Sequence, residues 1–346
     1  MRKITLGSTG IEIEKNGFGA LPIQRISRDD AAYLLRKAYD GGMNYFDTAR
    51  AYTDSEEKMG YAFRGMRDKV VIATKSGAKT AAELREELET SLRMLQTDYI
   101  DVYQFHNPAF CPKPGGEDGL YDEACKMRAE GKIRHVSITN HRLAVAQEAI
   151  ESGLYATLQF PFSYLSGEQE LRLVDACRQR GMGFIAMKGM AGGLIRDGYA
   201  AAAFMETQPD VVPIWGVQHE WELDQFLDCV RNGAELTEAR KATIARDREE
   251  LSGEFCRGCG YCMPCPQGIQ INQCARMMLM ARRAGERDWK TPYWQSEMKK
   301  VENCVHCRQC AAKCPYGLDT PKLLQENYEE YWKILAESEG GAGKNN

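Results

Sequence analysis

The chain has 346 residues, with 45 Lys and Arg against 49 Asp and Glu, and a formal net charge of −4 at pH 7. Hydrophobic residues make up 43% and charged residues 27%, which is typical of soluble globular proteins and argues against a disordered chain. No apolar run predicts a membrane span or a secretory signal, and the charge balance gives no reason to expect a nucleic-acid partner. The length predicts about two domains.

Residues 1–235 alternate short apolar runs with amphipathic stretches, the pattern of repeated βα units. A hairpin is predicted over Ile4–Ile13. The predicted strands are Gly17–Leu21, Met43–Asp47, Val70–Lys75, Tyr99–His106, Ile133–Thr139, Ala156–Gln159, Gly183–Met187 and Val211–Trp215. Helical patterns lie between them at Asp29–Asp40, Ala81–Leu95, Glu168–Arg180 and Trp221–Val230. Thr80 precedes Glu83 at the spacing of a capping box.

Eight strands, each followed by a segment of helix length, predict an α/β fold, a (β/α)8 TIM barrel. The alternative is a doubly wound sheet that binds a dinucleotide. Such a sheet needs Gly-x-Gly-x-x-Gly after its first strand, whereas Gly17-Phe-Gly-Ala-Leu-Pro lacks the third glycine.

The composition changes at Cys256, after a charged helix predicted over Ala234–Leu251 that Ser252-Gly253 ends. We therefore predict a barrel over residues 1–252, a small, mainly α-helical ferredoxin-like domain over 253–338, and a disordered tail over 339–346. A closing helix is predicted over Tyr328–Leu335.

The cysteines gather in two runs in this second domain. The runs consist of Cys256, Cys259, Cys262 and Cys265, then Cys304, Cys307, Cys310 and Cys314, and a proline follows each run. The second run has the bacterial ferredoxin spacing, in which the fourth cysteine ligates the neighbouring cluster. Two [4Fe–4S] clusters are predicted. By the ferredoxin rule, Cys314 joins the first three cysteines of the first run at one cluster, and Cys265 joins the first three of the second run at the other. The first run is one residue short of that spacing, which leaves the exchange open.

Zinc is the alternative to iron–sulfur clusters, because it also binds Cys-x2-Cys pairs. Zinc sites usually separate two pairs by a long loop, whereas each run here holds four cysteines close together. The remaining cysteines are scattered and are expected to be small buried hydrophobic residues; they are Cys111, Cys125, Cys177, Cys229 and Cys274. Free thiols in a chain of this length indicate a reducing compartment, the cytoplasm.

Titratable residues stand at the carboxyl ends of early strands, where barrel active sites form. Asp47, Lys75 and His106 each end a predicted strand, and Tyr52 follows in a loop. A lysine beside a phenol is expected to lower the pKa of the phenol, with Asp47 orienting the lysine. Tyr52 is therefore predicted to be a general acid for carbonyl reduction, or a base in the reverse direction.

The sequence around these residues resembles the aldo-keto reductase superfamily. Its motifs are Asn44-Tyr-Phe-Asp47-Thr-Ala-Arg-Ala-Tyr52, Val71-Ile-Ala-Thr-Lys75, Asp98-Tyr-Ile-Asp-Val-Tyr-Gln-Phe-His106 and Gly131-Lys-Ile-Arg-His-Val-Ser-Ile-Thr139-Asn140. The whole chain resembles the subgroup whose barrel carries a C-terminal ferredoxin-type [4Fe–4S] domain.

The resemblance implies hydride transfer between a nicotinamide cofactor and a carbonyl. It makes Asp47, Tyr52, Lys75 and His106 a catalytic tetrad. It also implies that the nicotinamide amide is bound by Thr139, Asn140 and Gln159. Members usually stack an aromatic ring on the nicotinamide after the seventh strand, where this chain has Met187 and Lys188.

The segment after the eighth strand also departs from the family. Residues 216–220 offer no Lys or Arg for an adenosine 2′-phosphate, and Glu220 and Glu222 would repel one. NADH, NADPH, weak nucleotide binding and another cofactor all stay open.

The sequence thus predicts an oxidoreductase that reduces an aldehyde or ketone, or oxidises the alcohol, with NAD(P)H. The expected partners are a small carbonyl substrate and a ferredoxin-like one-electron carrier. The alternative is an iron–sulfur electron-transfer protein whose barrel receives electrons from ferredoxin instead of NAD(P)H.

Overall fold

The computed structural model describes the chain except residues 1, 252–254, 284–288 and 342–346. The predicted helix end at Ser252-Gly253 and the last part of the predicted tail lie outside the described residues. The chain divides into two compact units. The first comprises Met1–Gly189 and Asp197–Ala245, and the second comprises Met190–Arg196 and Arg246–Asn346.

Eight parallel strands close a barrel in the first unit, in the order β10-β3-β4-β5-β6-β7-β8-β9. The strands are β3 Gly17–Gly19, β4 Tyr45–Asp47, β5 Val71–Ser76, β6 Ile100–His106, β7 Ile133–Thr139, β8 Thr157–Pro161, β9 Gly183–Met187 and β10 Val211–Gly216. The predicted hairpin is present as the antiparallel pair β1 Lys3–Thr5 and β2 Glu12–Glu14. The barrel prediction is confirmed.

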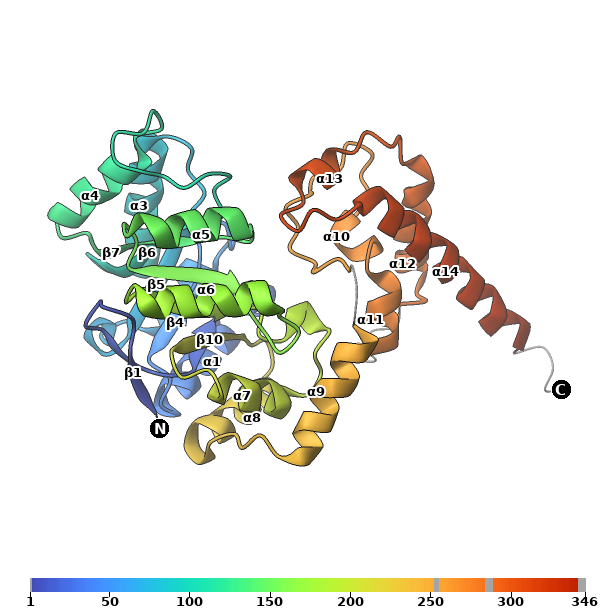
Figure 1. The fold of residues 1–346 in the computed structure, drawn as a ribbon, viewed down its shortest axis with the longest axis horizontal. Helices are drawn as coiled ribbons and strands as arrows, with labels where there is room; N and C mark the ends of the chain where they lie inside the picture. The colour runs from blue at the N-terminus through green and yellow to red at the C-terminus, as the bar shows by residue number, and fades with distance from the viewer. Residues whose placement is uncertain (1, 252–254, 284–288, 342–346) are drawn as a thin grey trace. The chain divides into compact units, whose positions relative to one another are not determined.

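Helices alternate with these strands along the chain and lie around the barrel (Figure 1). They are α1 Arg28–Asp40, α2 Ser55–Ala62, α3 Ala81–Leu95, α4 Leu120–Ala129, α5 Leu143–Ser152, α6 Glu168–Gln179, α7 Gly198–Glu206 and α8 Glu220–Asn232. Helix α9, Glu238–Glu250, follows α8 and contains the boundary between the two units. The start of α3 has the predicted capping box, since Thr80 accepts from the backbone N–H of Glu83 and Glu83 reaches back.

The second unit is helical in its described residues. Its helices are α10 Ile271–Cys274, α11 Met277–Arg283, α12 Pro292–Lys299, α13 Gln309–Lys313 and α14 Thr320–Gly341. Helix α14 is longer than the predicted closing helix and includes the first residues of the predicted tail. Asn327 on α14 accepts from the backbone N–H of Met278 and donates to the carbonyl of Ala275, which joins α14 to the segment around α11.

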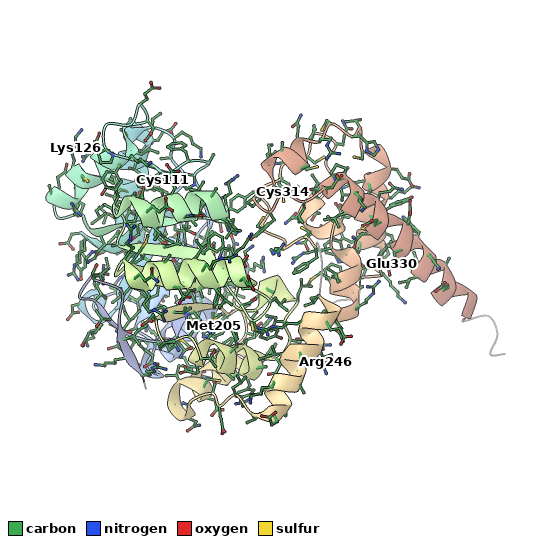
Figure 2. The ribbon with its side chains drawn as sticks, viewed as in Figure 1. Cys111, Lys126, Met205, Arg246, Cys314 and Glu330 are labelled. Atoms are coloured by element: carbon green, nitrogen blue, oxygen red, sulfur yellow. The ribbon has the colours of Figure 1, made fainter. Side chains whose placement is uncertain are left out.

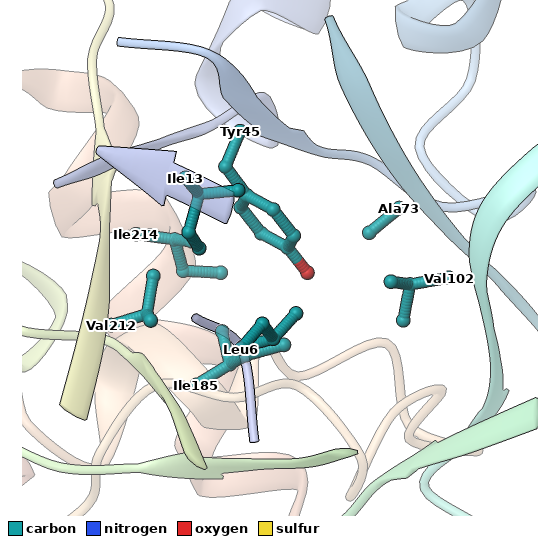
Figure 3. Close-up of a cluster of buried hydrophobic side chains, with 8 residues drawn as sticks. All are labelled: Leu6, Ile13, Tyr45, Ala73, Val102, Ile185, Val212 and Ile214. Carbon is teal, nitrogen blue, oxygen red and sulfur yellow. The ribbon is translucent and has the colours of Figure 1, made fainter. Parts of the chain in front are cut away.

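A hydrophobic cluster fills one level of the barrel interior (Figure 3). Leu6 and Ile13 from the hairpin segment pack there against residues of the barrel strands, which are Tyr45, Ala73, Val102, Ile185, Val212 and Ile214. Side chains two residues apart on a strand point to the same face. The inward positions one step nearer the carboxyl ends are therefore Asp47, Lys75, Gln104 and Met187. The packed core thus places a polar layer directly above it.

Candidate active site and cysteine-lined cavity

A buried ion pair stands at the centre of this polar layer. The Lys75 Nζ lies 2.5 Å from the Asp47 Oδ1, and both side chains are at most 3% exposed. Lys75 also donates to the backbone carbonyl of Thr48 at 2.6 Å. Burial raises the pKa of Asp47 and lowers that of Lys75, and the opposite charge of each partner resists both shifts. The pair is held by mutual attraction and hydrogen bonds within the buried polar layer.

Two amides complete the surroundings of Asp47. The Gln104 Nε2 donates to its Oδ2 at 3.1 Å, and the Gln159 Nε2 donates to its Oδ1 at 3.3 Å. Gln104 is not among the site residues predicted from the sequence. The sequence does contain a signal for its position, because Gln104 stands two residues before His106 on the same strand and therefore on the same face.

Tyr52 and His106 lie beside the ion pair. Their rings meet edge to face with centroids 5.9 Å apart, and the Lys75 Nζ is 5.2 Å from the centroid of the Tyr52 ring. The structure reverses the expected direction for the Tyr52 pKa. Burial raises it, and the negative charge of Asp47 acts in the same direction. The phenol is therefore protonated over the ordinary pH range.

His106 is a neutral imidazole at this site. Burial lowers its pKa to about 3, and the positive charges of Lys75 and Lys79 add to the shift. A neutral imidazole has one N–H donor and one acceptor nitrogen, so it can donate one hydrogen bond without bringing a second positive charge beside Lys75.

This burial predicts a pH effect on stability. Between the ordinary pKa of 6.5 and the folded value of about 3, the unfolded chain binds a proton at His106 and the folded chain does not. The free energy of unfolding should therefore fall as the pH falls through this window, by up to ~1.4 kcal/mol per pH unit from this residue. Urea titrations across the window should show a shallower slope for His106→Gln. Equal slopes for His106→Gln and the wild type would contradict a neutral imidazole at this position.

The residues expected to bind a nicotinamide stand on the three strands that follow. Thr139 ends β7, where it pairs in register with His106 on one side and Gln159 on the other. Met187 ends β9, and the Thr139 hydroxyl lies 3.9 Å from its sulfur. Lys188 follows with a left-handed backbone, φ 59°. The structure thus brings Thr139, Gln159 and Met187 to neighbouring strands at the carboxyl end.

The two amides in this set already contact protein atoms. Asn140 donates to the carbonyl of Pro108 and accepts from the backbone N–H groups of His141 and Arg142. Gln159 donates to Asp47, while its Oε1 is buried and has no hydrogen-bond partner among the described residues. Gln159 therefore keeps an acceptor for a further donor.

A second feature is a cavity in the second unit that is lined by cysteines of both runs. The cysteines are Cys262, Cys265, Cys304, Cys307 and Cys310. Apolar side chains from Ile269, Ile271 and Leu324 also line it. Cys265, the last cysteine of the first run, thus lines the same cavity as three cysteines of the second run.

Cys256 belongs to the first run, and its thiol is near Cys314 of the second run. Burial raises the pKa of its thiol, and the neighbouring Cys259 and Cys314 act in the same direction. Cys314 follows α13 in the second unit, whereas Cys111 belongs to the barrel (Figure 2). Among the described residues, no three His, Cys, Asp or Glu side chains are close enough to hold one metal ion. The evidence on cluster ligands therefore consists of the cysteine-lined cavity and of the thiols near Cys256.

Four of the remaining cysteines are buried, namely Cys111, Cys177, Cys229 and Cys274, and Cys125 is partly buried. The Cys274 thiol lies 3.8 Å from the backbone carbonyl of Glu297. Within the described part of the chain, no helix is long and apolar enough to cross a membrane.

Comparison with known families identifies both parts of the chain. Residues 3–246 match the model of the Aldo/keto reductase family. The chain belongs to the aldo/keto reductase family. As a member it is an oxidoreductase, and residues 255–319 match the 4Fe-4S dicluster domain, so this reductase carries an iron–sulfur domain.

Relatives of the reductase part are moderately similar. L-galactose dehydrogenase of Arabidopsis thaliana is 29% identical over 215 residues, which cover 56% of this chain and 66% of the relative. The chain thus spans about two thirds of the length of such curated relatives.

Solved reductase structures share the barrel. An aldo-keto reductase of Klebsiella pneumoniae in complex with NADPH has a TM-score of 0.59 and 26% identity, covering 71% of this chain and 95% of that one. The holo form of aldo-keto reductase AKR11C1 from Bacillus halodurans has a TM-score of 0.63 at 21% identity, covering 71% and 96%. The latter likeness concerns the fold alone.

Proposed function

We propose that this chain reduces an aldehyde or ketone to the alcohol, or runs the reverse reaction, with Tyr52 as the proton donor. The observation that carries the proposal is the meeting of Tyr52, His106, Lys75 and Asp47 at the carboxyl end of the barrel. A group that is protonated and poised beside a buried cation can deliver a proton to a carbonyl oxygen.

Each side chain has a distinct part in this proposal. Tyr52 gives its proton to the carbonyl oxygen as negative charge develops there. The neutral His106 donates a hydrogen bond to the same oxygen and fixes its position. The positive charge of Lys75 stabilises the phenolate that Tyr52 leaves, and Asp47 keeps Lys75 in place. Gln104 holds Asp47 in turn and is a positioning residue.

The residues at the ends of β7 to β9 fit a nicotinamide. The buried, unpartnered Oε1 of Gln159 is suited to the N–H of a carboxamide, and Thr139 and Asn140 stand beside it. When bound, a reduced nicotinamide supplies a hydride to the carbonyl carbon. Met187 and Lys188 would border its ring in place of an aromatic side chain.

The start of α8 favours NADH over NADPH. Lys37 from α1 lies near this segment, a contact that sequence analysis did not predict, but its Nζ is 2.5 Å from Glu220 and 2.6 Å from Asp224. Its charge is therefore already balanced by two carboxylates, which would repel a 2′-phosphate. A 2′-phosphate that bound Lys37 would have to displace its ion pairs with Glu220 and Asp224.

The cysteines of the second unit fit two [4Fe–4S] clusters. We assign Cys304, Cys307, Cys310 and Cys265 to one cluster because these four cysteines line one cavity. Cys262 also lines this cavity, but after burial Cys256 and Cys259 act on the pKa of its thiol more strongly than Cys310 does, so it is assigned to the other cluster. The other cluster is assigned to the remaining cysteines of the runs, which are Cys256, Cys259, Cys262 and Cys314. Each cluster carries single electrons, so the clusters would exchange electrons with an external one-electron carrier.

A titration of the anaerobically purified full chain tests the proposal. We expect NADH to bind more tightly than NADPH and to support reduction of a nitrobenzaldehyde. If neither nucleotide binds and reduced ferredoxin alone drives turnover, the electron-transfer alternative replaces this proposal. One observation favours this alternative: Cys307 is exposed and the adjacent Val305 is 60% exposed. A one-electron carrier could therefore approach the cluster that Cys307 is proposed to bind.

A further inference from the structure

Glu56 is a buried carboxylate near the candidate active site that has no part in the reaction proposed so far. It stands in the first turn of α2 and is 1% exposed. Its Oε1 accepts a hydrogen bond from the Thr74 hydroxyl at 2.7 Å, and its Oε2 forms an ion pair with the guanidinium of Arg50. A carboxylate is costly to bury unless it has charged and hydrogen-bonding partners, so these contacts hold Glu56 where it lies.

The two partners of Glu56 belong to the two segments that carry the proposed proton donor and its cation. Thr74 directly precedes Lys75 on β5, and successive side chains of a strand point to opposite faces, so Thr74 points out of the barrel. Arg50 stands two residues before Tyr52, between β4 and α2, and its backbone N–H donates to the carbonyl of Lys75 at 3.0 Å. Glu56 thus links the strand that carries Lys75 to the segment that carries Tyr52.

The ends of this segment are joined by another contact. Thr48 follows β4 directly, Ser55 begins α2, and their hydroxyl oxygens are 2.9 Å apart. The chain between them includes Thr53, which is exposed and has a left-handed backbone with φ 40°. Arg50 lies in the middle of the segment, where its side chain reaches the buried Glu56. The ion pair therefore ties the middle of the segment, next to the tyrosine, to a buried point of α2.

We propose that Glu56 is a positioning residue that sets the distance between the Tyr52 hydroxyl and the Lys75 ammonium. It acts through Arg50 on the segment before Tyr52 and through Thr74 on the strand before Lys75. A proton donor works only from the right place, and a misplacement of about 1 Å can cost on the order of 10²-fold in rate. The inference rests on the proposed function, in which Tyr52 gives the proton.

The variant Glu56→Gln tests this role with little change of shape. Its amide keeps an oxygen for the Thr74 hydroxyl but presents no charge to Arg50. We expect kcat for a nitrobenzaldehyde to fall about 10- to 100-fold, while KM and the dissociation constant of NADH change by less than about twofold. Thr74→Val should give a similar loss, and Thr74→Ser should restore most of it. The matched control is Glu57→Gln, on the exposed next residue of α2, which should keep the wild-type kcat.

A second background separates positioning from a purely structural role. Tyr52→Phe has no hydroxyl proton to place, so adding Glu56→Gln to it should change the remaining kcat by less than about twofold. A residue that only stabilises the fold would lower kcat by the same factor in both backgrounds. Circular dichroism and thermal unfolding record whether each variant is folded.

Thr74→Val replaces Glu56→Gln in both backgrounds if the latter variant does not fold. A wild-type kcat in the single variant, or an equal loss with and without the Tyr52 hydroxyl, would overturn the inference. Full activity of Tyr52→Phe alone would instead overturn the proposed function, because Tyr52 would then not be the proton donor.

Discussion

Tyr52→Phe should lose about 10²- to 10⁴-fold in kcat/KM for carbonyl reduction, because the ring stays in place while the only proton it can give is removed. The dissociation constant for NADH should hardly change, since the hydroxyl is proposed to act on the substrate oxygen. Steady-state kinetics with a nitrobenzaldehyde and nucleotide titrations by fluorescence measure the two effects separately.

Tyr99→Phe is the matched control. Tyr99 precedes β6, at the end of the strand opposite His106, and its ring packs on Arg67. This variant should keep wild-type kcat/KM. Full activity of Tyr52→Phe would remove Tyr52 from the reaction, whereas loss of nucleotide binding alone would make it a binding residue.

Cys265→Ser should halve the iron content of the anaerobically purified chain, from about eight to about four atoms per chain, because one cluster loses a ligand. Combination with Cys307→Ser should cost no further iron, since both cysteines are assigned to the same cluster. Combination with Cys259→Ser should remove nearly all iron. Iron and sulfide analysis reads out each variant.

Cys125→Ser controls for the loss of a thiol outside the runs and should keep the full iron content. If Cys265 instead belonged to the cluster of its own run, the pair Cys265→Ser and Cys259→Ser would retain about half of the iron. That outcome would contradict the exchange of Cys265 and Cys314 between the runs.

Much of the barrel could be predicted because its signals are local. Apolar runs mark the strands, and a residue that ends a parallel strand must lie near its counterparts on the neighbouring strands. Asp47, Lys75 and His106 are placed by this rule alone. Thr80 and Glu83 likewise specify the start of α3 through contacts within one turn.

The features that were missed depend on contacts between distant residues or on burial. Lys37 meets Glu220 and Asp224 only because α1 and α8 are neighbours in the closed barrel. The pKa of Tyr52 was predicted from the charge of Lys75, whereas burial decides its direction in the structure. Sequence patterns show which groups can meet, but not how much water remains around them.

The Met190–Arg196 segment has a consequence for how such a chain could be assembled. It leaves the barrel after β9, belongs to the second unit, and returns before α7. Arg283 donates to the carbonyl of Leu194, as Arg276 does to that of Gly192. A single cut after Ala245 would therefore strip this segment of its partners. Joining a plain reductase to a ferredoxin end to end would therefore not supply these contacts, because part of the second unit comes from within the reductase sequence.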